Sequence, residues 1–262
     1  MKPLTDTLWT IVRWTLPLTV AAVIVAVALG SHRVGEEVRR RVETRLRERF
    51  PALDIQVRAA SLIEGEGILI RDVSFAPADG AGAPIVTIEE VHLACGTSLA
   101  ELAAGEPRIT AVRLRRPVVQ AHRDAAGHWN IATLLEARGR GLGLPVTVED
   151  ATLAVEDLLL GRHFTLRSIG ITLRPASAQD AVERTVVQGR VGGDLFERAD
   201  FEGHLDGDGG FALAGHVEAL DLSPRLRGLL PASARLSDWA GTVRGRVDLD
   251  WTTSGSLADV ES

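Results

Sequence analysis

The chain is short of several residue types. Cys95 is its only cysteine and Lys2 its only lysine, so arginine carries nearly all of the positive charge. A single cysteine excludes an intrachain disulfide, although it does not indicate whether the compartment is oxidising or reducing. The formal net charge of −6 argues against nucleic acid as the main partner.

The familiar catalytic motifs are also missing. The sequence contains no G-x-S-x-G, H-E-x-x-H or P-loop motif. Gly139, Gly141 and Gly143 do not form G-x-G-x-x-G, because position 144 is leucine. The carboxylates are scattered over the expected strands, where a solvated role is the default. We therefore expect no catalytic residue, no cofactor and no enzymatic activity.

Two groups of polar residues have part of the pattern of a metal site. His122, Asp124 and His128 lie around one expected turn, but a zinc site would need a fourth ligand and firm geometry. Residues 206–210 lack the third ligand and the closing glutamate of a calcium loop, and they fit a hairpin turn better. No metal is expected at either position.

The sequence does contain a long series of short apolar runs. Hydrophobic residues make up 45% of the 262 residues and charged residues 24%, which is enough for a substantial core. From residue 53 onward, runs rich in Val, Ile, Leu and Thr alternate with Gly, Pro and Asp, which predicts a mainly β protein with short interrupting helices. The ten expected strands cover residues 53–59, 67–76, 84–94, 108–123, 145–156, 163–174, 184–191, 195–206, 210–219 and 241–252.

The last expected strand has the clearest alternation. One side presents apolar residues with Gly245 between them, and the other presents arginines and aspartates. A strand of this kind is typical of an antiparallel sheet that is open to solvent on one face. The apolar residues are Val243, Val247, Leu249 and Trp251.

The N-terminal segment predicts a membrane anchor over residues 1–31. Its apolar run ends at Leu29 and, counted from residue 8, would form a helix of about 33 Å, which spans a hydrocarbon core of ~30 Å. Trp9 and Trp14 flank the run as an aromatic belt would, and Arg13 lies near enough to its end to reach the headgroups.

Two features of this segment leave alternatives open. Ala26-Val27-Ala28 matches a small-x-small cleavage site, so a cleaved signal peptide is the rival interpretation. The arginines that follow the run would place the body of the protein in the cytoplasm by the positive-inside count. Long domains can nevertheless be translocated despite such flanking charge.

An amphipathic helix is expected next, over residues 32–52. Apolar residues recur every four positions on an Arg- and Glu-rich background, and the helix should end before Pro51. The stripe would pack against its own domain, lie at a membrane surface or plug one end of a groove. Its members are Val34, Val38, Val42, Leu46 and Phe50.

A strand, a tight turn and a helix start follow one another in the middle of the chain. Asp124 can bond the backbone two residues on, and Gly127 can take positive φ at little cost. Asn130 can cap a helix over residues 131–137. Trp129 is expected to anchor the turn by packing, so all four residues form a structural turn.

This turn resembles the signature of bacterial AsmA-like proteins, the group that includes the TamB and YhdP branches. In that family a strand ends in a Pro-Val pair and is followed by an Arg-Asp turn, a Gly, and Trp-Asn before a Leu-rich turn. The pieces at 67–75, 84–93 and 98–102 precede it in the family's order, and 239–249 resembles the family's later strands. The resemblance covers most of residues 1–130 and, more weakly, 220–252. The chain is shorter than members of the family, as a truncated member would be.

The resemblance implies an elongated, curved antiparallel β-sheet that forms an apolar groove. It implies a single-pass inner-membrane protein with its body in the periplasm, acting in phospholipid transfer or outer-membrane homeostasis in a Gram-negative-type bacterium. Membrane lipids would be its partners, and Val243, Val247, Leu249 and Trp251 would line the groove. The alternative is a scaffold that assists outer-membrane or other envelope proteins by β-strand pairing.

The expected organisation has five parts. An anchor and an amphipathic helix are followed by two β segments that a glycine-rich linker separates, and the second segment is open to continuation beyond the end of the chain. The parts are residues 1–31, 32–52, 53–138, 139–144 (the linker) and 145–262.

Overall fold

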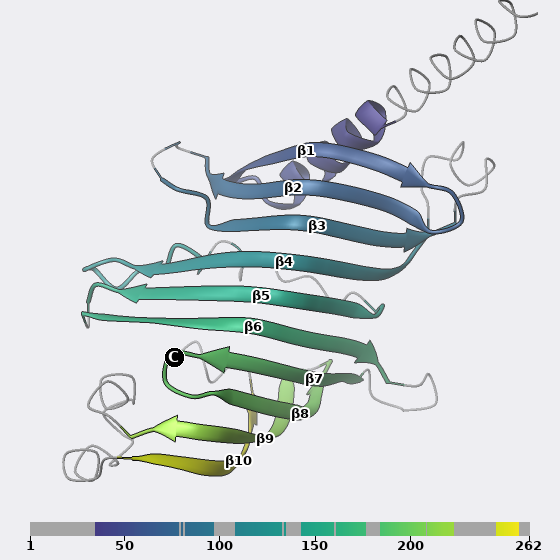
Figure 1. The fold of residues 1–262 in the computed structure, drawn as a ribbon. Helices are drawn as coiled ribbons and strands as arrows, with labels where there is room; N and C mark the ends of the chain where they lie inside the picture. Colours follow the sequence, from purple (N-terminus) through teal and green to yellow (C-terminus); the bar gives the residue numbers. More distant parts are fainter. Residues whose placement is uncertain are drawn as a thin grey trace, which may run out of the picture.

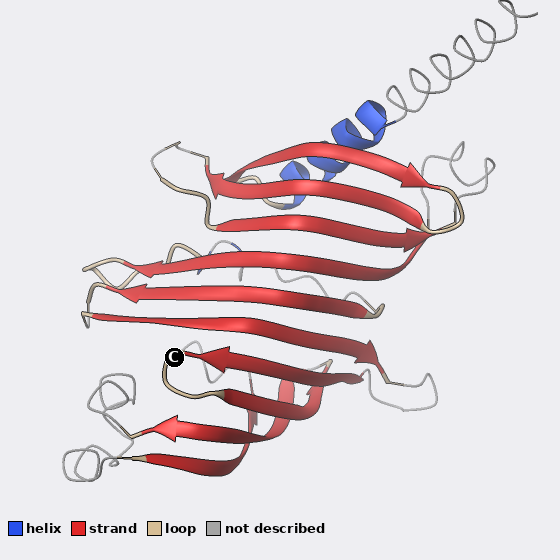
Figure 2. Ribbon diagram, viewed as in Figure 1, coloured by secondary structure: helices blue, strands red, loops and turns tan. Residues whose placement is uncertain are grey.

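A single open sheet of ten strands dominates the structure (Figures 1 and 2). The computed structural model describes residues 35–78, 80, 82–96, 108–132, 134, 143–159, 161–176, 184–207, 209–222 and 245–256. The strands follow one another in space in their sequence order. They are β1 (Leu53–Ile63), β2 (Gly67–Pro77), β3 (Val86–Cys95), β4 (Ile109–Arg123), β5 (Val146–Asp157), β6 (Arg162–Pro175), β7 (Arg184–Gly193), β8 (Arg198–Asp206), β9 (Gly210–Asp221) and β10 (Arg246–Ser256). Each strand falls on a predicted run, which confirms the mainly β class.

The largest boundary differences are at the two outer strands. β1 continues to Ile63, four residues beyond its expected end, and β10 continues to Ser256. The regular part of β10 begins after Gly245, whose φ of 144° is a conformation that residues with a side chain rarely adopt. Residues 241–244, including the groove candidate Val243, lie outside the described residues.

The prediction of a wholly antiparallel sheet is wrong, because the sheet is mixed. β4 and β5 pair in parallel, with Val112 opposite Val146 and Arg123 opposite Asp157. Every other neighbouring pair is antiparallel. A parallel pair needs a long crossover that returns the chain to the same end of the sheet. The predicted turn lies just after β4, where this connection begins, and most of the predicted linker, residues 139–142, lies outside the described residues. Both predicted β segments belong to one sheet.

The predicted amphipathic helix is present over residues 35–49 and lies beside β1 (Figure 2). Its stripe packs on the buried residues of β1–β3 through Val38, Val42, Leu46 and the following Phe50. The Phe50 ring meets Phe75 edge-on, with 5.9 Å between the ring centroids. Ion pairs between residues three or four apart support the solvent side of the helix.

The main buried cluster is confined to the first three strands and the residue just before β3. It comprises Leu53, Ile55, Val57, Ala60, Ile68, Ile70, Val73, Phe75, Ile85, Ile88, Val91 and Cys95. Burial becomes sparser from β4 onward, and β10 is exposed along almost its whole length. The sheet therefore has a packed end at β1 and an open end at β10.

Several strands keep their apolar residues on one face by interrupting strict alternation. In β2, the buried Ile70 and Val73 are separated by two exposed residues, the second of which is Asp72 with φ 52°. Arg116, with φ 49°, marks the same interruption in β4. These positions act like bulges, which bend a strand and re-aim its side chains.

The predicted anchor lies outside the described residues, together with its residues Trp9, Arg13, Trp14 and Leu29. Two of the short interrupting helices that the sequence predicts, one beginning at Ser98 and one at Ser223-Pro224, also lie outside the described residues. Among the residues that are described, no helix combines the length and the apolar character that a membrane crossing requires.

Candidate functional site

Two rows of directly paired residues cross the whole sheet on one face. Residues opposite each other on paired strands project to the same side, so each row forms one surface. The first row is Ala60, Ile70, Val91, Leu114, Val148, Ile171, Gly189, Phe201, Gly215 and Trp251. The second is Leu62, Ile68, Leu93, Val112, Val146, Leu173, Val187, Gly203, Leu213 and Thr253. We call this surface the apolar face; Thr253 is the one polar residue in the two rows.

On the apolar face, burial is greatest on β1–β3 and least on β10, and Val146 on β5 and Val187 on β7 are also buried. Ile70 on β2 is 3% exposed, because the helix and its apolar stripe cover this end. Val247 and Leu249 on β10 are 39% and 45% exposed. The helix therefore closes one end of the apolar face, and the other end is accessible.

On the last four strands, aromatic rings lie close against glycines of neighbouring strands. A Cβ at Gly189 would collide with the Phe201 ring, and a Cβ at Gly215 would lie 2.7 Å from the Trp251 ring. A Cβ at Gly255 would lie 3.3 Å from the Phe211 ring, which is a tight contact. Glycine in a strand allows such a close approach, so these rings lie flat against the neighbouring strands.

The groove candidates on β10 share one side of the strand. Val247 is opposite Leu220, Leu249 is opposite Val217, and Trp251 is opposite Gly215. A register shift separates the first two of these pairs. At this shift, Ala219 has φ 56° and donates its backbone N–H to the Asp248 carboxylate at 2.9 Å.

The sequence alone does not indicate that the apolar residues of β4–β9 belong to one surface. Each strand shows some alternation of its own, but the rows depend on the register between strands, which no single strand reveals.

The opposite face of the sheet carries opposite charges on neighbouring strands. Glu90 lies between Arg71, at 3.7 Å, and Arg115, at 3.2 Å. Arg190 and Asp200 approach to 2.7 Å. We call this surface the polar face. Each of its exposed ion pairs adds little stability, but together they keep this face solvated.

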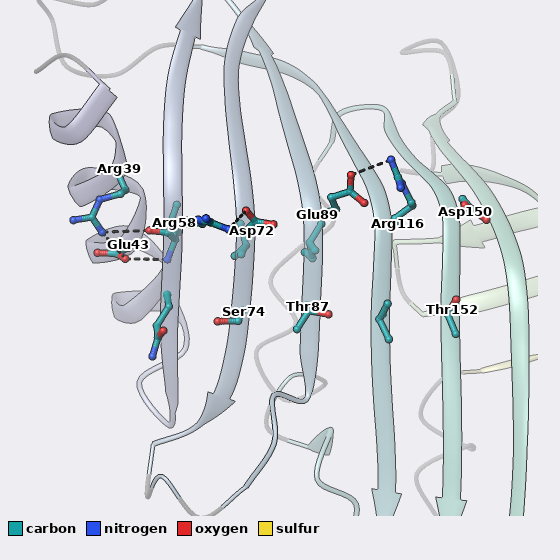
Figure 3. A pocket seen from close by; sticks show the side chains of 15 residues that line it. Arg39, Glu43, Arg58, Asp72, Ser74, Thr87, Glu89, Arg116, Asp150 and Thr152 are labelled. Carbon is teal, nitrogen blue, oxygen red and sulfur yellow. Dashed lines mark hydrogen bonds and ion pairs between the residues drawn. The ribbon is translucent and has the colours of Figure 1, made fainter. Parts of the chain in front are cut away.

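A hollow of about 930 Å³ lies on the polar face beside the helix (Figure 3). Arg58 pairs with Asp72 at 3.5 Å. Arg116 pairs with Glu89 at 2.9 Å. A charged ligand would have to compete with these pairs. The hollow is therefore a weaker candidate for a binding site than the apolar face.

The predicted structural turn is held by bonds between side chains and backbone. The Asp124 carboxylate accepts the backbone N–H of His128 at 2.9 Å, and the Asp124 N–H donates to the His128 carbonyl at 3.0 Å. The His128 N–H is the main reason that the pKa of Asp124 lies below its ordinary value. Gly127 has φ 94°, as the sequence predicts.

The sequence predicts that the Asn130 side chain caps a helix. In the structure this side chain bonds to the backbone of β4. Its Oδ1 accepts the His122 N–H at 2.8 Å, and its Nδ2 donates to the Gln120 carbonyl at 2.9 Å. The side chain therefore fastens the turn to the strand. Of the helix expected over 131–137, only residues 131, 132 and 134 are described.

Arg123 holds the turn and the end of β5 together, a role that the sequence does not indicate. Its guanidinium lies 5.7 Å from the Trp129 ring centroid and donates to the Gly127 carbonyl at 3.1 Å. It also contacts Asp157, which is 7% exposed at the end of β5, at 3.4 Å. The pairing of β4 with β5 creates this contact, and no local pattern indicates it.

The two groups with partial metal-site patterns have other contacts. His122 faces Glu156 at 3.2 Å, and Asp124 faces His128 at 3.4 Å. Gly209 donates to the Asp206 carbonyl at 3.0 Å in the turn between β8 and β9. Within the described part of the chain, no group of three or more potential ligands is arranged to hold a metal ion.

The apolar face is the candidate binding surface of the described chain, because most of its residues on β4–β10 are only half-buried and Val247 and Leu249 are exposed. Soluble monomers rarely expose large contiguous apolar patches, and such patches mark binding to proteins, membranes or ligands. No family model matches the chain, and no curated protein is significantly similar to it.

Proposed function

We propose that this chain is a membrane-anchored, AsmA-like protein whose apolar face forms a groove that shelters phospholipid acyl chains during transfer through the cell envelope. The continuity of the apolar rows over ten strands carries the proposal. Nine strand spacings of ~4.8 Å give the face a length of about 43 Å. Each methylene that the face removes from water contributes about 0.8 kcal/mol.

The distribution of burial gives the groove a direction. The helix fills the end at β1, so lipid would occupy the part from β4 to β10. Aliphatic residues and aromatic rings without charged neighbours in the rows suit acyl chains, which need no fixed polar partner. Headgroups would remain at the rim, in contact with water.

Sequence features support the proposed location. The apolar segment before residue 31 and the family resemblance support a single-pass inner-membrane protein with a periplasmic body. The helix over 35–49 would then lie between the membrane and the β1 end of the groove. The β10 end would be the end farther from the membrane.

Photo-cross-linking in cells tests the proposal directly. A photoreactive amino acid at Leu213, on the apolar face, should form adducts with phospholipid in the full-length protein. The matched control is Ala214, the next residue of β9, which faces the polar side. Adducts at Leu213 alone support the groove. Equal labelling at both positions, or lipid at neither, contradicts it.

A further inference from the structure

The β1 edge of the sheet is blocked by side chains of the helix. The Glu43 carboxylate accepts the Val57 N–H at 2.9 Å, and Arg39 donates to the Val57 carbonyl at 3.3 Å (Figure 3). Arg47 donates to the Ile55 carbonyl at 2.9 Å. These are backbone groups that an edge strand would otherwise offer to another strand.

The helix follows this edge along its length. Gly35, at its start, lies so close to β1 that a Cβ there would be 2.6 Å from the Ala60 carbonyl oxygen. Phe50, just after its end, packs on the buried cluster. An incoming strand would have to displace the whole helix together with its apolar stripe.

The β10 edge has a different construction. β10 is the last strand of the sheet, and no strand in the described ranges pairs with its outer side. It is exposed along nearly all of its 11 residues, including the apolar Val247 and Leu249. An exposed edge with apolar side chains is a template for strand addition.

The polar face indicates which kind of strand would fit there. Across the sheet, a basic residue repeatedly stands directly opposite an acidic residue of the next strand. The pairs are Arg71 and Glu90, Glu90 and Arg115, Arg184 and Asp206, Arg190 and Asp200, Arg198 and Glu218, and His216 and Asp250. On β10 this face presents Arg246, Asp248 and Asp250. Asp248 accepts the Ala219 N–H at 2.9 Å, and the Asp250 side chain is 90% exposed even though it contacts His216. The next strand outward would continue the pattern by placing basic residues opposite these aspartates.

We propose that the β10 edge recruits an extended segment of another protein, and that the β1 edge recruits none. The segment carries apolar residues on the side of Leu249 and Trp251 and basic residues on the side of Asp248 and Asp250. Sheet growth then has one direction, away from the helix. This recognition uses backbone bonds and charge and does not depend on lipid binding.

A second copy of this chain is a poorer occupant of the edge. Antiparallel pairing of β10 with itself over its full length would place Asp248 opposite Ser254 and Asp250 opposite Thr252, so no acid would meet a base. A shift of the register by two residues in one direction would place Asp250 opposite Asp250, and like charges in that position are unfavourable.

The test uses full-length protein in a non-ionic detergent and a synthetic peptide of alternating valine and arginine. Hydrogen exchange should show peptide-dependent protection of residues 246–256 and none of residues 53–63. A valine–glutamate peptide should give no protection. An N-methylated valine–arginine peptide, which keeps the charge but lacks the backbone donors, should give none either.

Matched variants separate charge recognition from damage to the fold. Asp248→Asn with Asp250→Asn should weaken the binding of the valine–arginine peptide at least tenfold, and Asp54→Asn on β1 should leave it unchanged. Asp248→Lys with Asp250→Lys should transfer the preference to the valine–glutamate peptide. This gain of binding cannot result from unfolding.

Three results would overturn the proposal. The first is equal protection of both sheet edges, and the second is equal binding of the N-methylated peptide. The third is a sedimentation-detected dimer in which β10 amides are already protected, because a second copy would then be the occupant. Because lipid cross-linking at Leu213 is measured separately, failure of this proposal and failure of the proposed function are distinguishable.

Discussion

At the residue scale, a few side chains with several contacts fix the crossover between β4 and β5. Arg123 joins the turn carbonyl of Gly127, the Trp129 ring and the buried Asp157. The Asn130 side chain bonds the His122 N–H and the Gln120 carbonyl of β4, as a neighbouring strand would. These contacts hold the chain where it leaves one antiparallel segment to form the single parallel pair among the described strands.

Gly127→Val should destabilise the protein by more than about 1 kcal/mol, because a β-branched residue is strained at a positive φ. Ala126→Val, one residue earlier at an exposed position of the same turn, is the control and should change stability by less than about 0.5 kcal/mol. Thermal or urea unfolding measures both variants. Equal stability of the two would show that the turn tolerates a side chain at 127.

His216 should titrate at a higher pH than an ordinary histidine. The hydrogen bond with Asp250 at 2.8 Å is the main reason that its pKa is raised above 6.5, and the nearby charges of Asp248 and Glu218 act in the same direction. Its stabilising contribution to the β9–β10 contact is therefore complete below about pH 6.5 and is lost as the pH rises through the raised value.

Asp250→Asn should return the pKa of His216 toward its ordinary value, which NMR titration of the imidazole measures. Asp206→Asn is the comparison, because it changes an acid on the same face that does not contact His216. An unchanged His216 titration in Asp250→Asn would show that the pair does not form in solution.

At the element scale, the helix over 35–49 has two roles that use different faces. Its apolar stripe completes the buried cluster, and its charged residues Arg39, Glu43 and Arg47 bond the backbone of β1. A charge pattern that looks like an ordinary solvated helix surface therefore contains the groups that close a sheet edge.

Glu43→Ala should cost about 1–3 kcal/mol, because it removes the acceptor of the Val57 N–H and leaves Arg39 without one of its two carboxylate partners. Glu37→Ala, which removes an exposed ion pair with Arg41, should cost less than about 0.5 kcal/mol. Chemical denaturation compares the two variants. If they are equally stable, the bond from Glu43 to the β1 edge contributes nothing.

At the scale of the whole molecule, the sheet is asymmetric from end to end. One end is packed and closed by the helix, and the other is exposed on its apolar face and unpaired at the edge formed by the described strand β10 (Figure 1). Under the proposed function, lipid would enter or leave at the β10 end only.

Val247→Glu and Leu249→Asp should reduce phospholipid cross-linking at Leu213 severalfold without unfolding the body, because both side chains are already exposed. Arg246→Ala, on the polar side of the same strand, should leave the cross-linking unchanged. Mass spectrometry of the adducts and circular dichroism of the purified variants provide the two measurements. Equal loss in all three variants would contradict a one-sided groove.

The sequence by itself determined the elements. Alternating Val, Ile and Leu between Gly, Pro and Asp breaks located all ten strands, and four-residue spacing located the helix, because side-chain periodicity and turn chemistry are local properties. Gly127 shows the same principle, since its conformation follows from a tight turn that the neighbouring residues already indicate.

Only the tertiary structure decided how these elements combine. The parallel pairing of β4 with β5 depends on where the crossover returns the chain, and the apolar rows depend on register across nine interfaces between neighbouring strands. The link from Arg123 to Asp157 and the bonds from Glu43 and Arg47 to β1 join residues on separate elements. Their formation depends on packing between elements, and a local sequence pattern contains no information about it.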